Sequence, residues 1–195
     1  MAGRYEAVAS PVARYFRPAF PEGSRVLDVG AGSGRDLAEL LALGYDAYGA
    51  EPVAEMAARA LAAHPQLQGR MSDAALPGLG APFGGGFDGI LCSAVLMHLP
   101  EADLFDAAFA LRNALRANGR LLLSLPLERG DVVSGERAAD GRLFSPCAPE
   151  RIQLLFERIG FQQVGRWDSG DALSRAGTRW YTLLFDLRAG GIPVQ

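Results

Sequence analysis

The sequence predicts an α/β fold: a seven-stranded, mostly parallel sheet between two layers of helices, with an antiparallel hairpin at its C-terminal edge. Three observations support this prediction. Short apolar runs alternate with stretches of helical periodicity from residue 24 to residue 125, and this order is typical of parallel strands joined by right-handed crossovers. A glycine-rich turn at 28–34 separates the first strand from the first helix. Two strand-like stretches, 161–168 and 178–187, end the pattern with a polar connection between them, which favours a hairpin.

The composition fits one globular domain over residues 1–195. The chain is 49% apolar, enough for one sizeable core but not for a separate substrate domain. Its net charge of −3, with acids and bases interspersed, offers no basic stripe and therefore disfavours a nucleic acid partner. All 19 basic residues are arginine, so a lysine base or a Schiff base is excluded.

The cysteine pattern and the hydropathy indicate the compartment. Cys92 and Cys147 lie far apart and match neither a zinc-binding nor a redox spacing. We therefore expect no metal site and a reducing cytoplasm. No apolar run approaches the roughly 20 residues that span a bilayer, and the N-terminus lacks the apolar stretch of a signal peptide. The expectation is a cytoplasmic protein without a membrane partner; the sequence indicates no oligomeric state.

The N-terminal segment 1–23 is expected to be a helical lead-in. Aromatic residues recur between residues 4 and 20, and prolines at 11, 18 and 21 break and end the pattern. This helix is expected to pack its rings on the sheet. The first strand covers 26–29, the helix after the glycine turn ends at Gly44, and residues 45–50 alternate like a second strand.

The alternation continues to the C-terminal strands. The expected elements are a helix at 52–63, strands at 67–71 and 87–93, a helix at 103–117, a strand at 120–125 and a helix at 150–159. Between the fifth strand, at 120–125, and the helix at 150–159, residues 127–146 are expected to form a long polar loop at the ligand-binding edge of the sheet. Loops of this length are usually functional or mobile.

The turn at 28–34 has the pattern D-x-G-x-G-x-G, with Asp28 followed by Gly30, Gly32 and Gly34. Glycine accepts a positive φ and lets a ligand lie against the backbone. The following helix offers unpaired N–H groups and a positive dipole end, which suit a carboxylate or a phosphate. A dinucleotide fold would place its third glycine one residue later, where this chain has Arg35.

Glu51 stands at the tip of the second strand, 19 positions after Gly32. An acid at this place can accept hydrogen bonds from both hydroxyls of a ribose. The alternative is a capping or solvated acid before the next helix. Met56, on the first turn of that helix, packs either on an adenine face or in the core.

Several motifs in order resemble those of the class I S-adenosylmethionine (AdoMet) methyltransferases, which have a Rossmann-like three-layer fold. The glycine turn resembles their first motif, and the exit of the fourth strand at 93–100 resembles their fourth. The run L-R-N-A-L-R-A-N-G-R-L-L-L at 111–123 and the phrase F-S-P-x-x-P-E-R-I at 144–152 are similar to later parts of the pattern. The resemblance covers roughly residues 24–187.

The resemblance implies AdoMet as cofactor and a set of residues that hold it. The methionine part would lie along the glycine turn, with Asp28 near its amino group and Arg35 facing either its carboxylate or solvent. Glu51 would hold the ribose, and Asp73 with the N–H of Ala74 the adenine, unless Asp73 only caps a helical turn. The full implied set is Asp28, Gly30, Ala31, Gly32, Gly34, Arg35, Glu51, Pro52, Met56, Asp73, Ala74, Ser93 and Ala94.

The acceptor side is less specified. In the resembling family the segment before the first strand often folds over the cofactor, which makes Tyr5 and Tyr15 candidate acceptor contacts. His98 is either a base for the acceptor or a structural residue that ties its loop to the backbone. The loop 127–146 is expected to cover the acceptor. The N-P-P-Y exit of enzymes that methylate nucleobase or glutamine amino groups is absent, which argues against those acceptors.

The expected function is therefore methyl transfer from AdoMet to a small-molecule acceptor by in-line displacement. Two alternatives remain open. One is an inactive AdoMet-binding partner or sensor, whose acceptor pocket its own side chains would fill. The other is a nicotinamide-nucleotide oxidoreductase, which the shifted third glycine and the C-terminal hairpin disfavour.

Overall fold

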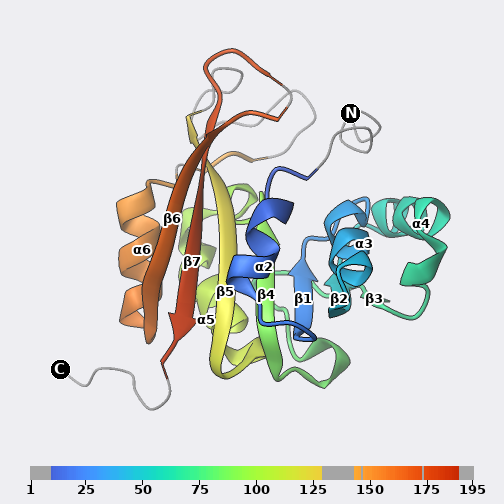
Figure 1. The fold of residues 1–195 in the computed structure, drawn as a ribbon. Coiled ribbons are helices and arrows are strands. Elements are labelled where there is room, and N and C mark those ends of the chain that lie inside the picture. The colour runs from blue at the N-terminus through green and yellow to red at the C-terminus, as the bar shows by residue number, and fades with distance from the viewer. Residues whose placement is uncertain (1–9, 129–142, 146, 173, 189–195) are drawn as a thin grey trace.

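A seven-stranded mixed sheet forms the centre of the computed structural model, which describes residues 10–128, 143–145, 147–172 and 174–188 (Figure 1). The strand order is β3-β2-β1-β4-β5-β7-β6. The strands are β1 (Arg25–Val29), β2 (Asp46–Ala50), β3 (Met71–Ser72), β4 (Phe87–Ser93), β5 (Leu115–Glu128), β6 (Phe161–Gly170) and β7 (Arg179–Leu187). Strands β1 to β5 pair in parallel, and β7 is antiparallel to both β5 and β6. The predicted fold class is confirmed.

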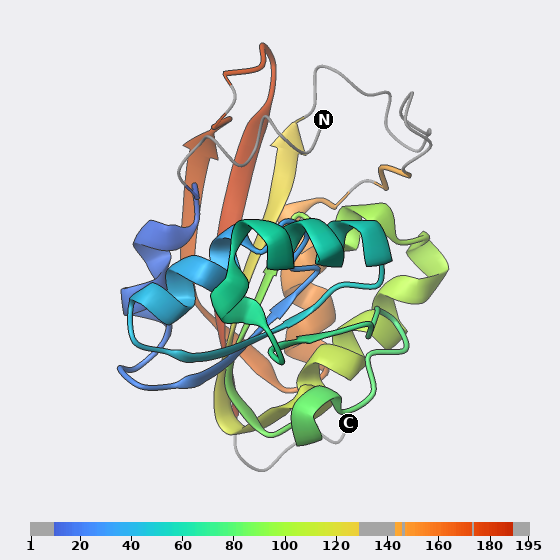
Figure 2. The same cartoon turned by 90° about the vertical axis from the view of Figure 1, so that its right-hand side faces the viewer.

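Helices cover both faces of this sheet (Figure 2). They are α2 (Phe16–Ala19), α3 (Arg35–Ala42), α4 (Ala54–Ala63), α5 (Leu104–Ala114) and α6 (Pro149–Arg158), with the 3₁₀ turns η1 (Ala13–Tyr15), η2 (Pro65–Leu67), η3 (Pro82–Gly84), η4 (Leu96–His98) and η5 (Glu101–Asp103). The segments η1, α2, α3 and α4 contribute to one core, and α5 and α6 to the other. Together with the sheet they make three layers.

Alternating side chains of the central strands feed these two cores. On β5, Leu122 packs with the α3 side, whereas Leu121 and Leu123 pack with the α5 and α6 side. All three are fully buried, as expected for a strand covered on both faces. The two apolar layers hold the sheet rigidly, so its loop-bearing edge is a fixed frame for a site.

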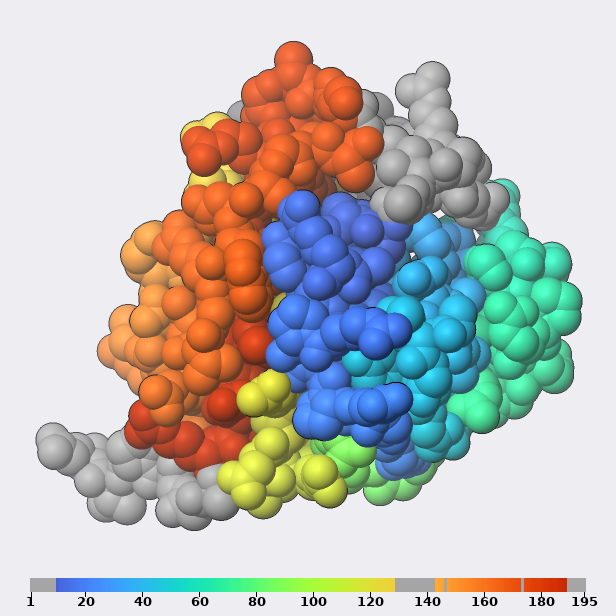
Figure 3. Space-filling view, viewed as in Figure 1, coloured from blue at the N-terminus to red at the C-terminus, as the bar shows by residue number. Residues whose placement is uncertain are grey.

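The N-terminal segment docks on the face that carries α3. Figure 3 shows η1 and α2, in dark blue, filling the surface between β6 and α3. Phe16 and Phe20 are buried there, and the Tyr45 hydroxyl donates to both their carbonyl oxygens at 3.3 and 3.1 Å. Pro18 was predicted to end the helix but lies inside α2, because the first turn of a helix tolerates a proline.

Several element boundaries differ from the prediction, most of all at β3 and at the junction of α5 and β5, which begins at Leu115 and not at residue 120. The third strand was expected at 67–71, but residues 65–67 form η2 and the strand is Met71–Ser72. Gly69, with φ +76°, makes the turn between them. The helix predicted to run to residue 117 ends at Ala114, because Leu115 already pairs with Phe87 of β4. Asn118, with φ +61°, bends β5 before its central pairing begins.

Some expectations fall on residues outside the described ranges. The lead-in residues 1–9 and most of the loop 127–146 belong to this group. The assignment of the whole chain to one domain therefore stays a prediction. Among the described residues, no helix is long and apolar enough to cross a membrane, and no His, Cys, Asp and Glu side chains cluster as metal ligands.

Candidate functional site

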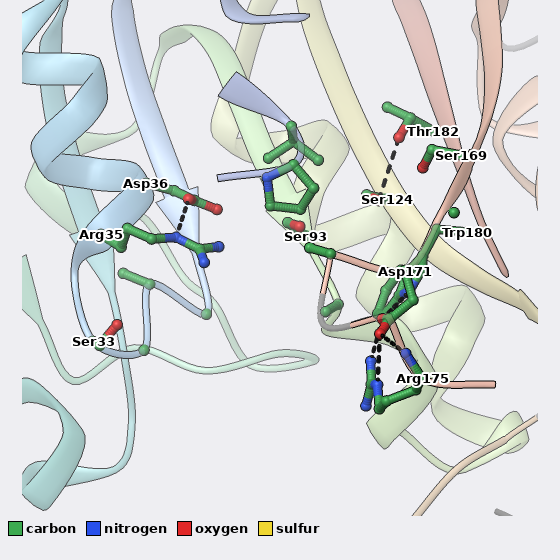
Figure 4. Close-up of a pocket in the computed structure, with 18 of the residues that line it drawn as sticks. Ser33, Arg35, Asp36, Ser93, Ser124, Ser169, Asp171, Arg175, Trp180 and Thr182 are labelled. Atoms are coloured by element: carbon green, nitrogen blue, oxygen red, sulfur yellow. Dashed lines mark hydrogen bonds and ion pairs between the residues drawn. The ribbon is translucent and has the colours of Figure 1, made fainter. Parts of the chain in front are cut away.

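A cavity of about 260 Å³ opens at the edge of the sheet where β1 and β4 end. Two walls face each other across it (Figure 4). We call one the glycine-loop wall; its residues are Gly30, Ala31, Gly32, Ser33, Arg35, Asp36 and Met56. We call the other the hairpin wall; its residues are Ser124, Ser169, Asp171, Arg175, Trp180 and Thr182. Ser93 and Ala94 lie between them at the end of β4.

Glycine is required at the three positions of the turn for different structural reasons. All three have positive φ, at 75°, 56° and 77°. A side chain at Gly30 would collide with Val95, and one at Gly34 would meet Leu67 at 2.5 Å. A Cβ at Gly32 would make only ordinary contacts, with Met56 at 3.7 Å and with the Gly30 carbonyl oxygen at 3.9 Å. Close packing within the protein thus explains the first and third glycines, whereas at the middle one, which lines the cavity, a Cβ would meet no close contact.

Glu51 holds the glycine loop in place. Its Oε2 accepts a hydrogen bond from the Gly32 N–H at 2.9 Å, and its Oε1 accepts one from the Val53 N–H at 2.9 Å. The residue is 7% exposed. A carboxylate has about four acceptor positions, so two remain for a ligand's donors. Pro52, which follows it, is exposed.

Asp28 is a buried acid beneath the glycine loop. It is 3% exposed, and its Oδ2 has no hydrogen-bond partner among the described residues. Burial raises the pKa of this carboxyl well above its ordinary value, and the nearby Asp36 raises it further. The positive charge of Arg35 lowers the pKa in part, and Glu51 raises it again. An unsatisfied buried oxygen of this kind fits a ligand that brings a positive charge and N–H donors.

Arg35 and Asp36 open α3 and form the charged part of the glycine-loop wall. The Arg35 Nε lies 3.0 Å from Asp36 Oδ1, with both side chains largely buried. Their pairing holds the guanidinium beside the cavity (Figure 4). It therefore places a cation at the first turn of a helix, close to an entering anionic group.

The residues predicted to hold an adenine lie beyond the cavity. Asp73 is exposed directly after β3, and Ala74 is half-buried against the core on the α5 side. The Glu51 N–H donates to the Ser72 carbonyl at 2.9 Å, so the ends of β2 and β3 are adjacent. Asp73 thus shares this edge with Glu51, and neither residue is among those that line the cavity. Met56 does line it, half-buried beside Gly32.

The exit of β4 lies at the bottom of the cavity. Ser93 ends the strand, and Ala94 has φ +59°, an uncommon value for a residue with a side chain. The Ala94 N–H donates to the Ser124 carbonyl at 2.8 Å, which fixes this turn to β5. Strained backbone held by its surroundings is typical of functional sites, and both residues were predicted from the sequence.

The hairpin wall was missed by the sequence analysis. Asp171, whose side chain is 3% exposed, accepts hydrogen bonds from Arg175 Nη2 at 2.6 Å and from Trp180 Nε1 at 3.1 Å. The hydrogen bonds from Arg175, above all, hold the pKa of this carboxyl well below its ordinary value. The i,i+4 spacing of Asp171 and Arg175 was a signal of a local pair, but nothing local indicated that it faces the glycine loop.

Two buried hydroxyls extend this wall toward β5. Thr182 Oγ1 donates to Ser124 Oγ at 3.3 Å, and Ser124 Oγ donates to the Tyr181 carbonyl at 3.4 Å. Both residues are almost fully buried. These two hydroxyl groups therefore give the hairpin wall polar atoms that a ligand can contact.

Two of the predicted acceptor contacts lie elsewhere, and Tyr5 is outside the described residues. Tyr15 is buried and stacks on Trp167, with ring centroids 4.7 Å apart. His98 Nδ1 lies 2.8 Å from the Leu143 carbonyl, and the imidazole packs edge-on against Phe144. Neither side chain is among those that line the cavity; Pro11 and Val12 line it from the N-terminal segment instead.

Comparison with known proteins gives a consistent picture. The sequence model of a family described as a methyltransferase domain matches residues 2–166. No curated protein sequence matches the chain. Among solved structures, the 1,6-didemethyltoxoflavin-N1-methyltransferase of Burkholderia thailandensis superposes with a TM-score of 0.75 at 22% identity, over 95% of this chain and 80% of that one.

Two further structures share the fold. The magnesium protoporphyrin IX methyltransferase of Synechocystis PCC 6803 has a TM-score of 0.68 at 20% identity, over 96% of this chain and 80% of that one. The 4+2 cyclase SpnF has a TM-score of 0.69 at 17% identity, over 92% of this chain and 81% of that one. At these identities the likeness establishes the fold alone, since one fold serves several chemistries.

Proposed function

Because the chain belongs to the methyltransferase domain family, we propose that it transfers a methyl group to a small-molecule acceptor. Its cofactor is S-adenosyl-L-methionine, which supplies a methyl group already activated by its bond to a positively charged sulfur. The observation that carries the proposal is the cavity between the two walls, which joins a charged glycine turn to a separate polar surface. The charged glycine turn suits the amino-acid group of the cofactor, and the separate polar surface suits an acceptor.

The described residues fit this cofactor. The buried Asp28 oxygen lacks a partner beside the glycine loop, and an ammonium group provides one. The Arg35 guanidinium lies at the start of α3, where a carboxylate is favoured by both the side chain and the helix dipole. The cavity borders Gly32, where the missing side chain lets a ligand chain run along the backbone.

We assign the remaining contacts by their place at the same edge. Glu51 accepts the ribose hydroxyls with the lone pairs that Gly32 and Val53 leave free. Asp73 and the Ala74 N–H hold the adenine, with Met56 against its face. Ser93 and Ala94 lie under the junction of the two walls, where the reacting atoms meet.

The protein's part in the reaction is positioning and exclusion of water. An in-line displacement needs the acceptor atom on the side opposite the bond that breaks. Holding the two reactants in this orientation can account for much of the rate enhancement. The glycine-loop wall fixes the donor, and the hairpin wall fixes the acceptor with Trp180, Ser124 and Thr182. Both carboxylates that line the cavity, Asp36 and Asp171, are paired with arginines. This arrangement suits an acceptor that is nucleophilic without a carboxylate base.

We further propose that the protein works in the cytoplasm on a freely diffusing acceptor. The net charge of −3 with interspersed signs gives no electrostatic footprint for nucleic acid. The cavity of about 260 Å³ is of a size for part of a small ligand and not for a macromolecular surface.

Calorimetry with AdoMet and with S-adenosylhomocysteine tests the binding, and NADH serves as the comparison ligand. We expect both sulfur nucleosides to bind and NADH not to. Glu51→Ala should weaken binding by about 5- to 150-fold, as for the ~1–3 kcal/mol of lost hydrogen bonds to a charged group. Glu55→Ala is the matched control, because Glu55 is an exposed acid on α4 whose ion pair within the described part of the chain is with Arg59.

Turnover is tested by release of S-adenosylhomocysteine over a panel of small-molecule acceptors. Release of S-adenosylhomocysteine with any acceptor of the panel supports the proposed methyltransferase activity. Tight AdoMet binding without release over the whole panel would favour a binding protein. Binding of NADH in place of the sulfur nucleosides would overturn the proposal.

A further inference from the structure

We propose that binding the amino-acid end of the cofactor expels a proton from Asp28, so that cofactor affinity depends on pH. The inference rests on the proposed function, since it concerns the same site. It makes Asp28 a residue that exchanges its own proton for the ammonium group of the ligand.

The first ground is the state of the buried oxygen. Asp28 is 3% exposed at the end of β1, and its Oδ2 has no partner among the described residues. An ionised carboxylate without partners is costly in such a place, and a protein usually avoids this cost by protonating the group. Burial therefore favours the neutral acid form of Asp28 in the free protein and raises the pKa of this carboxyl above its ordinary value.

The second ground is the charge of the groups around it. Arg35 and Asp36 face Asp28 from α3, Glu51 from the end of β2, and Cys92 from β4. Burial raises the pKa of the Cys92 thiol far above its ordinary value, so Cys92 is neutral. Three carboxyl groups therefore share one guanidinium, and Arg35 is already paired with Asp36 at 3.0 Å. Loss of the Asp28 proton in the free protein would add a second net negative charge to this cluster.

The ligand changes this balance. Its α-ammonium group brings one positive charge and N–H donors, so the carboxylate form of Asp28 becomes the favoured one. The Asp28 O–H bond then breaks, its proton goes to the buffer, and the ammonium keeps its own three protons. Burial, then Asp36, raise the pKa of Asp28 in the free protein. Affinity should therefore rise with pH through that raised pKa, by at most about tenfold per pH unit, and level off above it.

The experiment is calorimetry of S-adenosylhomocysteine at one pH in two buffers, phosphate and Tris, whose ionisation enthalpies differ. The enthalpy difference counts the protons released. We expect up to one proton for S-adenosylhomocysteine and none for 5′-methylthioadenosine, which has the same nucleoside but no amino-acid end. Equal release with both ligands would overturn the proposal, because it would place the proton at the ribose end.

The variant Asp28→Asn assigns the proton to its residue. It should bind S-adenosylhomocysteine without proton release and with an affinity that does not change with pH. The matched variant Glu55→Gln changes an exposed acid on α4, away from Asp28, and should still release a proton. Proton release by Asp28→Asn equal to that of the wild type would overturn the proposal. If the variant is unstable, the comparison of S-adenosylhomocysteine with 5′-methylthioadenosine in the wild type tests the proposal instead.

Failure of this inference is distinct from failure of the proposed function. If neither sulfur nucleoside binds, the proposed function fails. If S-adenosylhomocysteine binds with the same enthalpy in both buffers and its affinity does not change with pH, the function stands and the proton exchange is wrong.

Discussion

The two walls of the cavity differ in how their polar groups are satisfied. Beneath the glycine-loop wall, a buried Asp28 oxygen has no hydrogen-bond partner among the described residues. In the hairpin wall, Asp171 accepts hydrogen bonds from Arg175 and Trp180, and Thr182 donates to Ser124. The acid beneath the first wall has a hydrogen-bonding position left for a ligand, whereas Asp171 and Thr182 in the second wall already have protein partners.

This difference separates affinity from orientation. An unsatisfied buried acid gains much from a ligand that brings N–H donors and a positive charge, because little water screens the contact. A satisfied network gains little energy from a ligand but keeps its shape, which is what positioning an acceptor requires. We infer that the glycine-loop wall governs how tightly the cofactor binds and that the hairpin wall governs which acceptor fits.

Gly30→Ala should have the largest effect, because it breaks the glycine-loop wall itself. The new methyl group would collide with Val95, and the backbone has φ +75°. Overpacking and a left-handed residue together cost about 2–5 kcal/mol of unfolding free energy. Urea denaturation measures the loss, and calorimetry should find no cofactor binding at accessible concentrations.

Gly44→Ala is the matched control for this change. Its φ is +89°, but a methyl group there would meet nothing within 4 Å. It should show only the backbone cost of about 1–2 kcal/mol and normal binding. The double variant Gly30→Ala with Val95→Ala should regain part of the stability. Equal losses for the two single variants would show that Val95 contact does not explain Gly30.

Asp171→Asn should have the next effect, on the hairpin wall. It removes the charge that holds Arg175 and Trp180, at a cost of about 1.5–3 kcal/mol for hydrogen bonds to a charged group. The pKa of Asp171 is depressed in the folded state. Its contribution is therefore complete above the ordinary Asp value of about 3.9 and is lost as the pH falls below it. Thermal unfolding at pH 7 and pH 3 should show the difference between variant and wild type shrinking in acid.

The same variant tests whether the two walls act separately. Cofactor affinity should change by less than about twofold, since the charge on the glycine-loop wall is intact. Asp168→Asn is the control, because Asp168 on β6 is an exposed partner of Arg166 at 3.5 Å and such pairs contribute little. A large loss of cofactor affinity in Asp171→Asn alone would show that the hairpin wall also binds the cofactor.

The sequence predicted one wall and not the other, for a physical reason. Asp28, Gly32, Arg35 and Glu51 lie within one β-α-β unit, so local spacing already brings them together. Ser124 and Thr182 are 58 residues apart and meet only because β7 pairs with β5 in one register. Nothing within either segment specifies that register, and the hydroxyls look like ordinary strand residues.

The fold was predicted more completely than the boundaries. Apolar periodicity identified β4 at its observed bounds, because this strand is buried on both faces. It misplaced β3, since a strand of two residues carries no periodicity and η2 supplied the apolar Leu67 instead. It also extended α5 past Ala114, because Leu115 continues the helical spacing while pairing with β4.

His98→Ala should have the smallest effect and decides whether the acceptor side holds a proton acceptor. His98 Nδ1 contacts the Leu143 carbonyl at 2.8 Å, and the Ser145 hydroxyl donates to the Leu99 carbonyl at 2.7 Å, so the imidazole is one of several ties between these segments. Its removal should cost about 1 kcal/mol of unfolding free energy and leave cofactor affinity unchanged. His98→Gln keeps an N–H donor and should restore both stability and turnover if the role is structural. Turnover that stays low in the glutamine variant, at wild-type stability and cofactor affinity, would instead make His98 a base, because glutamine cannot take up a proton.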